Sequence, residues 1–155
     1  MSRLATTNNR MTQLQREVLG PLIGKIATGF RYEPSPNPQL FSDKFSIRLR
    51  LIDQKDSELF LGIHYKLYGS DSTPRVALNL GLNLMTTEGI EHQGVLGGFV
   101  REEQETLETF LRQPLTGFQL SKDQSLELVF SHQSLIFEVD RDEDTGELHL
   151  GWAIG

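Results

Sequence analysis

Three stretches decide the fold: FSIRLRL at residues 45–51, LFLGIHYKLY at 59–68 and VALNLGLNL at 76–84. In each stretch large apolar residues stand at every second position. A period of two gives a strand with one apolar and one more polar face, as in an antiparallel sheet covered on one side. The connections at 53–57 and 69–74 are short and rich in turn-forming residues. The three stretches therefore predict a β-meander.

The residues before the meander predict a helix and a linker. Apolar residues recur every three or four positions from Met11 to Phe30, which is typical of an amphipathic helix. Gly20–Pro21 predicts a kink or a division into two short helices, and Gly29 predicts the end of the helix. Residues 31–40 contain three alternating prolines and are expected to form an extended crossover from helix to sheet. Residues 1–8 are expected to be flexible.

The residues after the meander complete the expected fold. Residues 86–98 hold four glycines and predict either a bulged fourth strand or a loop. Residues 101–113 predict a short acidic helix, and alternation at 126–130, 135–139 and 148–152 predicts three more strands. We therefore expect one α+β domain over residues 1–155. It is a mostly antiparallel sheet of about six or seven strands, a meander and then C-terminal hairpins, packed by the N-terminal helix and the short acidic helix.

Several classes of chemistry lack their motifs. The chain has no cysteine, which excludes disulfides, thiolate metal sites and a cysteine nucleophile. Its four histidines lack metal-ligand spacing, and no nucleophile elbow or phosphate-binding glycine loop occurs. The acidic run at 140–146 begins like a calcium-binding loop, but Thr145 and Gly151 stand where that loop needs glycine and glutamate. The sequence predicts a protein without catalysis, cofactor or metal. The alternative is an enzyme or small-ligand binder with a dispersed site near the glycine-rich segment 94–98.

Charge is divided unevenly along the chain, whose formal net charge is -6. Residues 1–80 hold 11 Lys and Arg against 7 Asp and Glu, whereas residues 81–155 hold 4 against 14. The acidic half either forms an ordinary solvated surface or steers a basic protein partner. The N-terminus has no secretion signal and no segment is apolar enough to span a membrane, so a cytoplasmic protein is expected.

One surface stands out as a candidate partner-binding site. Side chains two positions apart on a strand share a face, so the meander gathers basic and aromatic residues opposite its leucines. The predicted site residues are Arg48, Arg50, Phe60, His64, Lys66 and Tyr68. Arginine and aromatic residues are enriched at protein-binding hot spots. Basic and aromatic residues on a sheet also bind single-stranded nucleic acid, and a plain solvated face is a third interpretation.

No stretch of the chain carries the motifs of a recognisable family. The leading hypothesis is a small, non-catalytic protein-binding module: an adaptor, assembly factor, inhibitor or immunity-type protein. It would act through the basic and aromatic strand face or through the acidic C-terminal half. Single-stranded nucleic-acid binding on the same strand face is the alternative, and the oligomeric state stays open.

Overall fold

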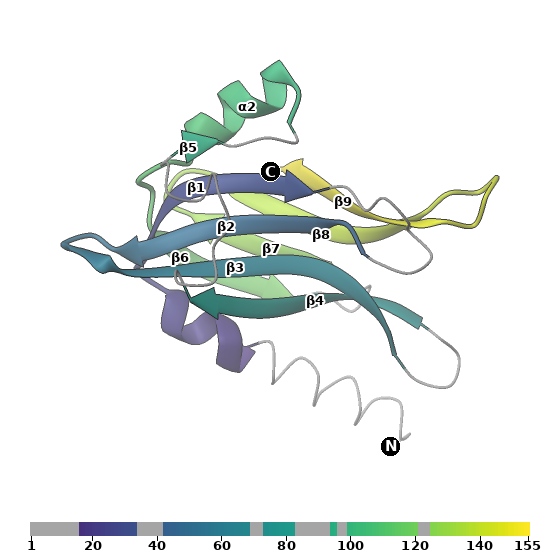
Figure 1. Cartoon of the computed structure of the whole chain (residues 1–155), viewed down its shortest axis with the longest axis horizontal. Coiled ribbons are helices and arrows are strands. Elements are labelled where there is room, and N and C mark those ends of the chain that lie inside the picture. Colours follow the sequence, from purple (N-terminus) through teal and green to yellow (C-terminus); the bar gives the residue numbers. More distant parts are fainter. Residues whose placement is uncertain (1–15, 34–41, 69–72, 83–93, 96–98, 121–124) are drawn as a thin grey trace.

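Two β-sheets are stacked one behind the other in the computed structural model of the chain, which describes residues 16–33, 42–68, 73–82, 94–95, 99–120 and 125–155 (Figure 1). Sheet A has the strand order β4-β3-β2-β1-β5, and sheet B has the order β6-β7-β8-β9. Every neighbouring pair is antiparallel except β1 with β5. The fold is therefore mostly antiparallel β-sheet with short helical segments, and it is α+β in the broad sense.

The predicted meander is confirmed in sheet A. It consists of β2 (Lys44–Leu51), β3 (Gln54–Tyr68) and β4 (Thr73–Leu82). β3 and β4 pair over ten consecutive positions without a register shift. The turn between β2 and β3 is tighter than predicted, because a bulge between Leu49 and Leu51 lets Leu51 pair with Gln54.

The predicted helix over residues 11–30 is wrong in its second half. Residues 16–19 are helical and continue into one turn of 3-10 helix (η1, Gly20–Leu22), but Ile26–Glu33 form strand β1. Pro21 lacks the N–H that a continuing helix needs, and Gly24 has φ +91, which ends the helical path. Ile26 and Phe30 misled the prediction because a spacing of four residues fits both the helical period and the strand period. Gly29 therefore lies inside a strand and does not end a helix.

Two further elements, a short strand and a helix, lie at the upper edge of sheet A in Figure 1. β5 (Gly94–Val95) is a two-residue strand that runs parallel to β1 at Gly29 and Phe30. The acidic helix is α2 (Arg101–Glu108), five residues shorter than predicted. The predictions for residues 1–8, for the proline-rich residues 34–40 of the crossover and for most of 86–98 fall outside the described residues.

Sheet B corrects the predicted arrangement. Its strands are β6 (Leu115–Leu120), β7 (Leu126–Phe130), β8 (Ser134–Arg141) and β9 (Leu148–Ile154), and the last three match the predicted strands. β6 was not predicted, because Gly117 and a bulge between Leu115 and Gly117 interrupt its alternation. The described residues therefore form nine strands in two sheets, where six or seven strands in one sheet were expected. The apolar face of sheet A packs mainly against sheet B, whereas helices were expected to cover it.

Aromatic side chains join the two sheets. Phe45 of β2 lies 4.9 Å from Phe137 of β8 and 5.4 Å from Trp152 of β9, measured between ring centroids. Phe110, just after α2, lies 6.2 Å from Phe30 and 5.4 Å from Phe130, so it closes one side of the core. Replacing such a buried ring by alanine typically costs about 3–5 kcal/mol.

The sheets also meet through the backbone at one corner. Ile26 of β1 forms an isolated antiparallel bridge with Pro114. The N–H of Gly24 donates to the carbonyl of Leu115, and the N–H of Leu115 donates to the carbonyl of Lys25, at 2.8 Å each. The start of β1 is thereby hydrogen-bonded to the start of β6. Across the described residues, no helix is long and apolar enough to cross a membrane.

Candidate functional site

The strand face, the side of sheet A that points away from sheet B, carries the residues predicted as the partner-binding site. Arg48 and Arg50 lie on β2, and Phe60 and His64 lie on β3. Arg48 pairs directly opposite Phe60. The remaining two predicted residues occupy the end of β3, where Lys66 pairs with Arg75 and Tyr68 with Thr73. The positions of these last two side chains are outside the described part of the structure.

Glu58, which sequence reasoning overlooked, organises this face. Both Nε and Nη2 of Arg48 contact the Oε2 atom of Glu58. The Arg48 guanidinium carbon also lies 5.9 Å from the centroid of the Phe60 ring, within the range of a cation–π contact. Arg48 is 9% exposed and Glu58 is 5% exposed. The guanidinium is therefore held in one position and its charge is neutralised.

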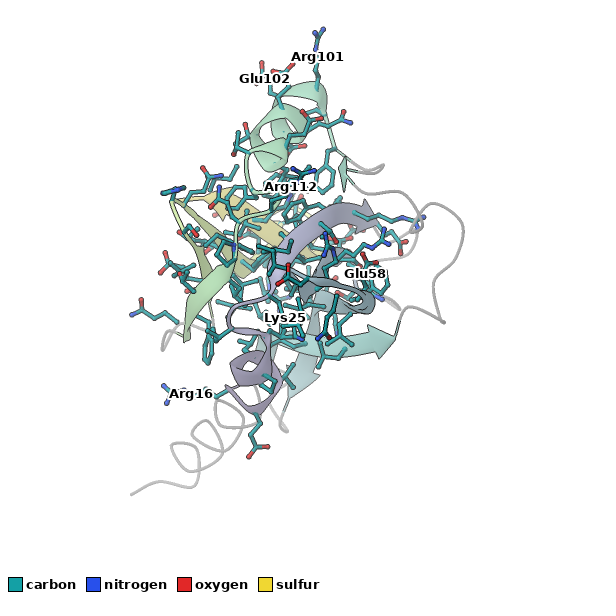
Figure 2. The ribbon with its side chains drawn as sticks, turned by 90° about the vertical axis from the view of Figure 1, so that its left-hand side faces the viewer. Arg16, Lys25, Glu58, Arg101, Glu102 and Arg112 are labelled. Atoms are coloured by element: carbon teal, nitrogen blue, oxygen red, sulfur yellow. The ribbon has the colours of Figure 1, made fainter. Side chains whose placement is uncertain are left out.

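Arg50 is also engaged by the protein itself. Its Nη1 donates to the carbonyls of Leu51 and Ile52 at 3.0 and 2.9 Å, so it secures the turn between β2 and β3. Its Nε lies 3.9 Å from Oε1 of Glu58. The carboxylate of Glu58 thus lies between two arginines. Figure 2 shows Glu58 among the strands of sheet A, far from Arg101 and Glu102 at the outer end of α2.

The rest of the strand face is partly covered. Phe60 and His64 are half-buried, while Gly62 and Ala77 between them are buried. Thr28 of β1 donates its hydroxyl to the carbonyl of Arg48 and is itself buried. The face therefore presents a half-buried phenylalanine ring and an imidazole around a fixed, neutralised arginine. Of the cations on this face whose side chains the structure describes, Arg48 and Arg50 are both engaged by the protein itself.

A second polar cluster lies between the two sheets and was not predicted. Its centre is Asp43, immediately before β2, which is 2% exposed. Oδ2 of Asp43 accepts a hydrogen bond of 3.0 Å from the N–H of Leu150 on β9. Nδ1 of His149 lies 3.5 Å from the same oxygen. We call Asp43, His149, Tyr32 and Tyr65 the inter-sheet cluster.

Two tyrosines complete the inter-sheet cluster. The Tyr65 hydroxyl donates to the carbonyl of Leu148 at 2.8 Å, which ties β3 to β9. Burial raises the pKa of Tyr32 to about 12, helped by the charge of Asp43 and a hydrogen bond to it. Burial also raises the pKa of Tyr65, and the charges of Asp43 and Glu147 add to the shift. Both phenols are therefore protonated donors at neutral pH.

The inter-sheet cluster is best described as a connection between β9 and sheet A. An N–H and a carbonyl of β9 that point away from β8 are bonded by Asp43 and Tyr65, so this stretch of the edge strand is closed. The imidazole of His149 also lies 3.8 Å from Oε2 of Glu147. Within the described ranges, no group of three or more potential ligands is placed to hold a metal ion.

The acidic elements of the second half lie apart from one another in Figure 1, on α2 and at the tip of the β8–β9 hairpin. On α2, Oε1 of Glu103 accepts the N–H of Val100, and Glu105 pairs with Arg101 at 3.2 Å. At the hairpin tip, Oδ1 of Asp142 accepts the N–H groups of Asp144 and Thr145, and these bonds lower the pKa of Asp142. The calcium-like run is thus used to form a turn.

The glycine-rich segment 94–98, the alternative ligand site from the sequence, is described only in part. The glycine-rich segment contributes β5, whereas residues 96–98 lie outside the described residues.

Asp43 and His149 come from different sheets, more than one hundred residues apart, which explains why sequence spacing did not indicate them. The only local signal is an acid directly before an alternating apolar run.

No protein-family model, no curated protein and no solved structure matches this chain. The function must therefore be argued from the geometry of the chain itself.

Proposed function

We propose that this protein is a non-catalytic protein-binding module and that the strand face is its binding surface. One observation carries the proposal: the carboxylate of Glu58 lies against Arg48 and close to Arg50. A surface on which a buried arginine is already paired with a carboxylate, beside a phenylalanine and a histidine, suits the surface of another protein. Such residues supply contact area and hydrogen-bond donors.

The same observation disfavours nucleic acid on this face. Binding to single strands depends on free cations that neutralise phosphates, together with rings on which bases stack. Here Arg48 is already neutralised, Arg50 donates to main-chain carbonyls, and Glu58 would repel a phosphate. The net charge of -6 adds to this repulsion.

Arg48 of the strand face is also held in place before any partner arrives. The Arg48 guanidinium is fixed by Glu58 and lies against the ring of Phe60. A side chain already held in one rotamer loses less conformational entropy on binding, which saves about 0.5–1.5 kcal/mol per residue. Phe60, half-buried in the free protein, would be the central contact, and His64 would supply a polar contact beside it. The exposed acids of α2 and of the β8–β9 hairpin would affect the rate of association and its salt dependence.

The test uses matched phenylalanine variants of the full-length protein. Tagged wild type, Phe60→Ala and Phe118→Ala are used to capture partners from the cells that make the protein. Phe118 is also half-buried but lies on β6 of sheet B, so it controls for the general loss of a ring. The proposal predicts a protein retained by wild type and Phe118→Ala but lost, or weakened at least tenfold, with Phe60→Ala.

A second measurement examines nucleic acid directly. Fluorescence anisotropy of labelled single-stranded DNA and RNA is recorded at low salt with the wild-type protein. We expect no saturable binding. Binding that is strong at low salt, falls steeply with added salt and is lost with Phe60→Ala would overturn the proposal in favour of a nucleic-acid surface.

A further inference from the structure

Three half-buried aromatic rings meet at one end of the core, away from the strand face. Tyr32 lies at the end of β1, Phe99 two residues before α2, and Trp152 on β9. In Figure 1 α2 lies above β1 and the C-terminal end of β9. The buried ring of Phe45 lies against all three rings, at centroid distances of 5.4 to 6.5 Å. We call Tyr32, Phe99 and Trp152 the aromatic corner.

The rings of the aromatic corner do not form a flat stack. The planes of Phe99 and Trp152 are nearly perpendicular, at 86°, and their centroids are 5.6 Å apart. Tyr32 lies 6.2 Å from Phe99 and is tilted by 39° against it. The rings therefore form the walls of a corner, and each keeps part of its surface exposed. The negative face of an aromatic ring attracts a cation, and the indole of tryptophan attracts it most strongly.

Two carboxylates act on the aromatic corner. Glu103 is held in place at the start of α2, because its Oε1 accepts the N–H of Val100 at 3.0 Å. Burial is the main cause of the raised pKa of Tyr32, and the charges of Asp43 and Glu103 raise it further. The electrostatic potential at the corner is therefore negative, which favours a positively charged group there.

Exposed aliphatic side chains flank the aromatic corner. Val100 follows Phe99 and is 65% exposed. Ile154 lies two residues beyond Trp152, on the same face of β9, and is 38% exposed. These side chains offer apolar contacts to residues on either side of a bound cation, which only a cation carried by a polypeptide can use. Aromatic rings with such neighbours are typical of protein-binding sites.

We infer that the aromatic corner binds an arginine side chain of a partner protein. A guanidinium is planar and weakly hydrated, so it can stack on a ring while its N–H groups donate to a carboxylate, here that of Glu103. Charge complementarity favours a basic segment as the source of the arginine. Residues 81–155, which include Phe99, Glu103 and Trp152, hold 14 Asp and Glu against 4 Lys and Arg. The corner shares no residue with the strand face, so this inference is independent of the proposed function.

The fluorescence of Trp152, the only tryptophan of the chain, reports directly on the aromatic corner. The full-length protein is titrated at constant ionic strength with acetyl-arginine amide to about 50 mM, since a single side chain binds with a dissociation constant of about 1–10 mM. Acetyl-citrulline amide, which has nearly the same shape without the charge, is the control. We expect a saturable change in emission with the arginine compound only. No saturable change, or the same change with citrulline, would overturn the inference.

Two matched pairs of variants assign the binding to the corner, with circular dichroism to confirm that each variant is folded. Phe99→Leu should weaken arginine binding about fivefold or more, whereas Phe118→Leu on β6 should leave it unchanged. Glu103→Gln keeps an oxygen that can accept the N–H of Val100 but removes the charge, so binding should weaken about threefold. Glu138→Gln changes the net charge equally at an exposed position of β8 and should have no effect.

The two pairs fail independently of each other. If Phe99→Leu does not fold, the glutamate pair still decides, because Glu103→Gln keeps both the side-chain volume and the helix cap. Equal arginine binding by Glu103→Gln and Glu138→Gln, or by folded Phe99→Leu and Phe118→Leu, would contradict binding at the aromatic corner.

Discussion

Glu58 on the strand face and Asp43 between the sheets are both carboxylates that are almost entirely removed from water, yet they have different surroundings. Glu58 contacts a full positive charge, the guanidinium of Arg48, within a single hairpin. Asp43 receives a main-chain N–H from the other sheet and lies beside an imidazole and a phenol. The first arrangement fixes a side chain of the proposed binding surface, and the second connects the two sheets. Removing each carboxylate should therefore have different consequences.

The largest effect is expected at Glu58. Glu58→Ala leaves Arg48 buried without its counter-charge, which should lower the free energy of unfolding by about 3–5 kcal/mol. Urea denaturation of wild type and variant measures this change. Glu138→Ala on β8 removes an exposed carboxylate and should change stability by less than about 0.5 kcal/mol.

A double variant tests whether the loss of stability comes from leaving one buried charge unpaired. Arg48→Met combined with Glu58→Leu removes both charges and should recover stability to within about 1 kcal/mol of wild type. If the double variant were as unstable as Glu58→Ala, packing rather than the ion pair would explain the loss. The double variant should also lose partner binding while folded, because the fixed guanidinium is gone.

Asp43→Ala is expected to have the next largest effect, about 2–3 kcal/mol. The substitution leaves the N–H of Leu150 without its acceptor and removes the hydrogen bond to Tyr32. Thermal unfolding measures the loss, with Asp140→Ala as an exposed control on β8. Partner binding by the folded fraction should be unchanged, in contrast with variants of the strand face. Lost binding by folded Asp43→Ala would place this residue in the binding surface and break the comparison.

Tyr65→Phe tests the connection between sheet A and β9 with a smaller change. It removes only the hydrogen bond to the carbonyl of Leu148 and keeps the ring. The expected loss is about 1 kcal/mol. Hydrogen exchange should locate the change at β9, with little effect on β2 and β3, whereas a uniform increase in exchange would contradict a local connection.

A further effect is a dependence of stability on alkaline pH. The folded state raises the pKa of Tyr32 from 10.0 to about 12, so folding favours the protonated phenol. This contribution to stability is fully present below about pH 10 and is lost as the pH rises from 10 to 12. Denaturation at a series of pH values should show stability falling over this window. The fall should be smaller in Tyr32→Phe, and an equal fall in both proteins would exclude Tyr32 as a source.

The two regions also differ in how far the sequence predicts them. Arg48, Phe60 and His64 share a face because they lie at even positions of a meander, and period-two alternation is a local property. The neutralising role of Glu58 was missed because residues 53–57 were predicted as a connection, which left Glu58 at the very start of the next strand. In the structure the bulge in β2 shortens the turn, so Glu58 lies well inside β3. The inter-sheet cluster was missed because Asp43 and His149 meet only after the sheets stack. Local periodicity carries no information on that step.

The fold shows the same division. Residues 44–51, 54–68 and 73–82 form the three strands of the predicted meander, since each has a clean alternation. Residues 26–33 and 115–120 were not predicted as strands, because a four-residue spacing in β1 and an interrupting glycine in β6 hide their period. Because β6 was not predicted, all strands were assigned to one sheet, and helices were expected to cover it. In the structure β6 completes a second sheet of four strands, which covers the first sheet.

The central claim is that the strand face binds a protein. The most direct measurement is capture by the tagged wild-type protein from its native cells, divided into nuclease-treated and untreated halves. We predict one protein, close to equimolar with the bait and equally abundant in both halves. Retained species that disappear after nuclease treatment would contradict the claim and identify nucleic acid as the ligand.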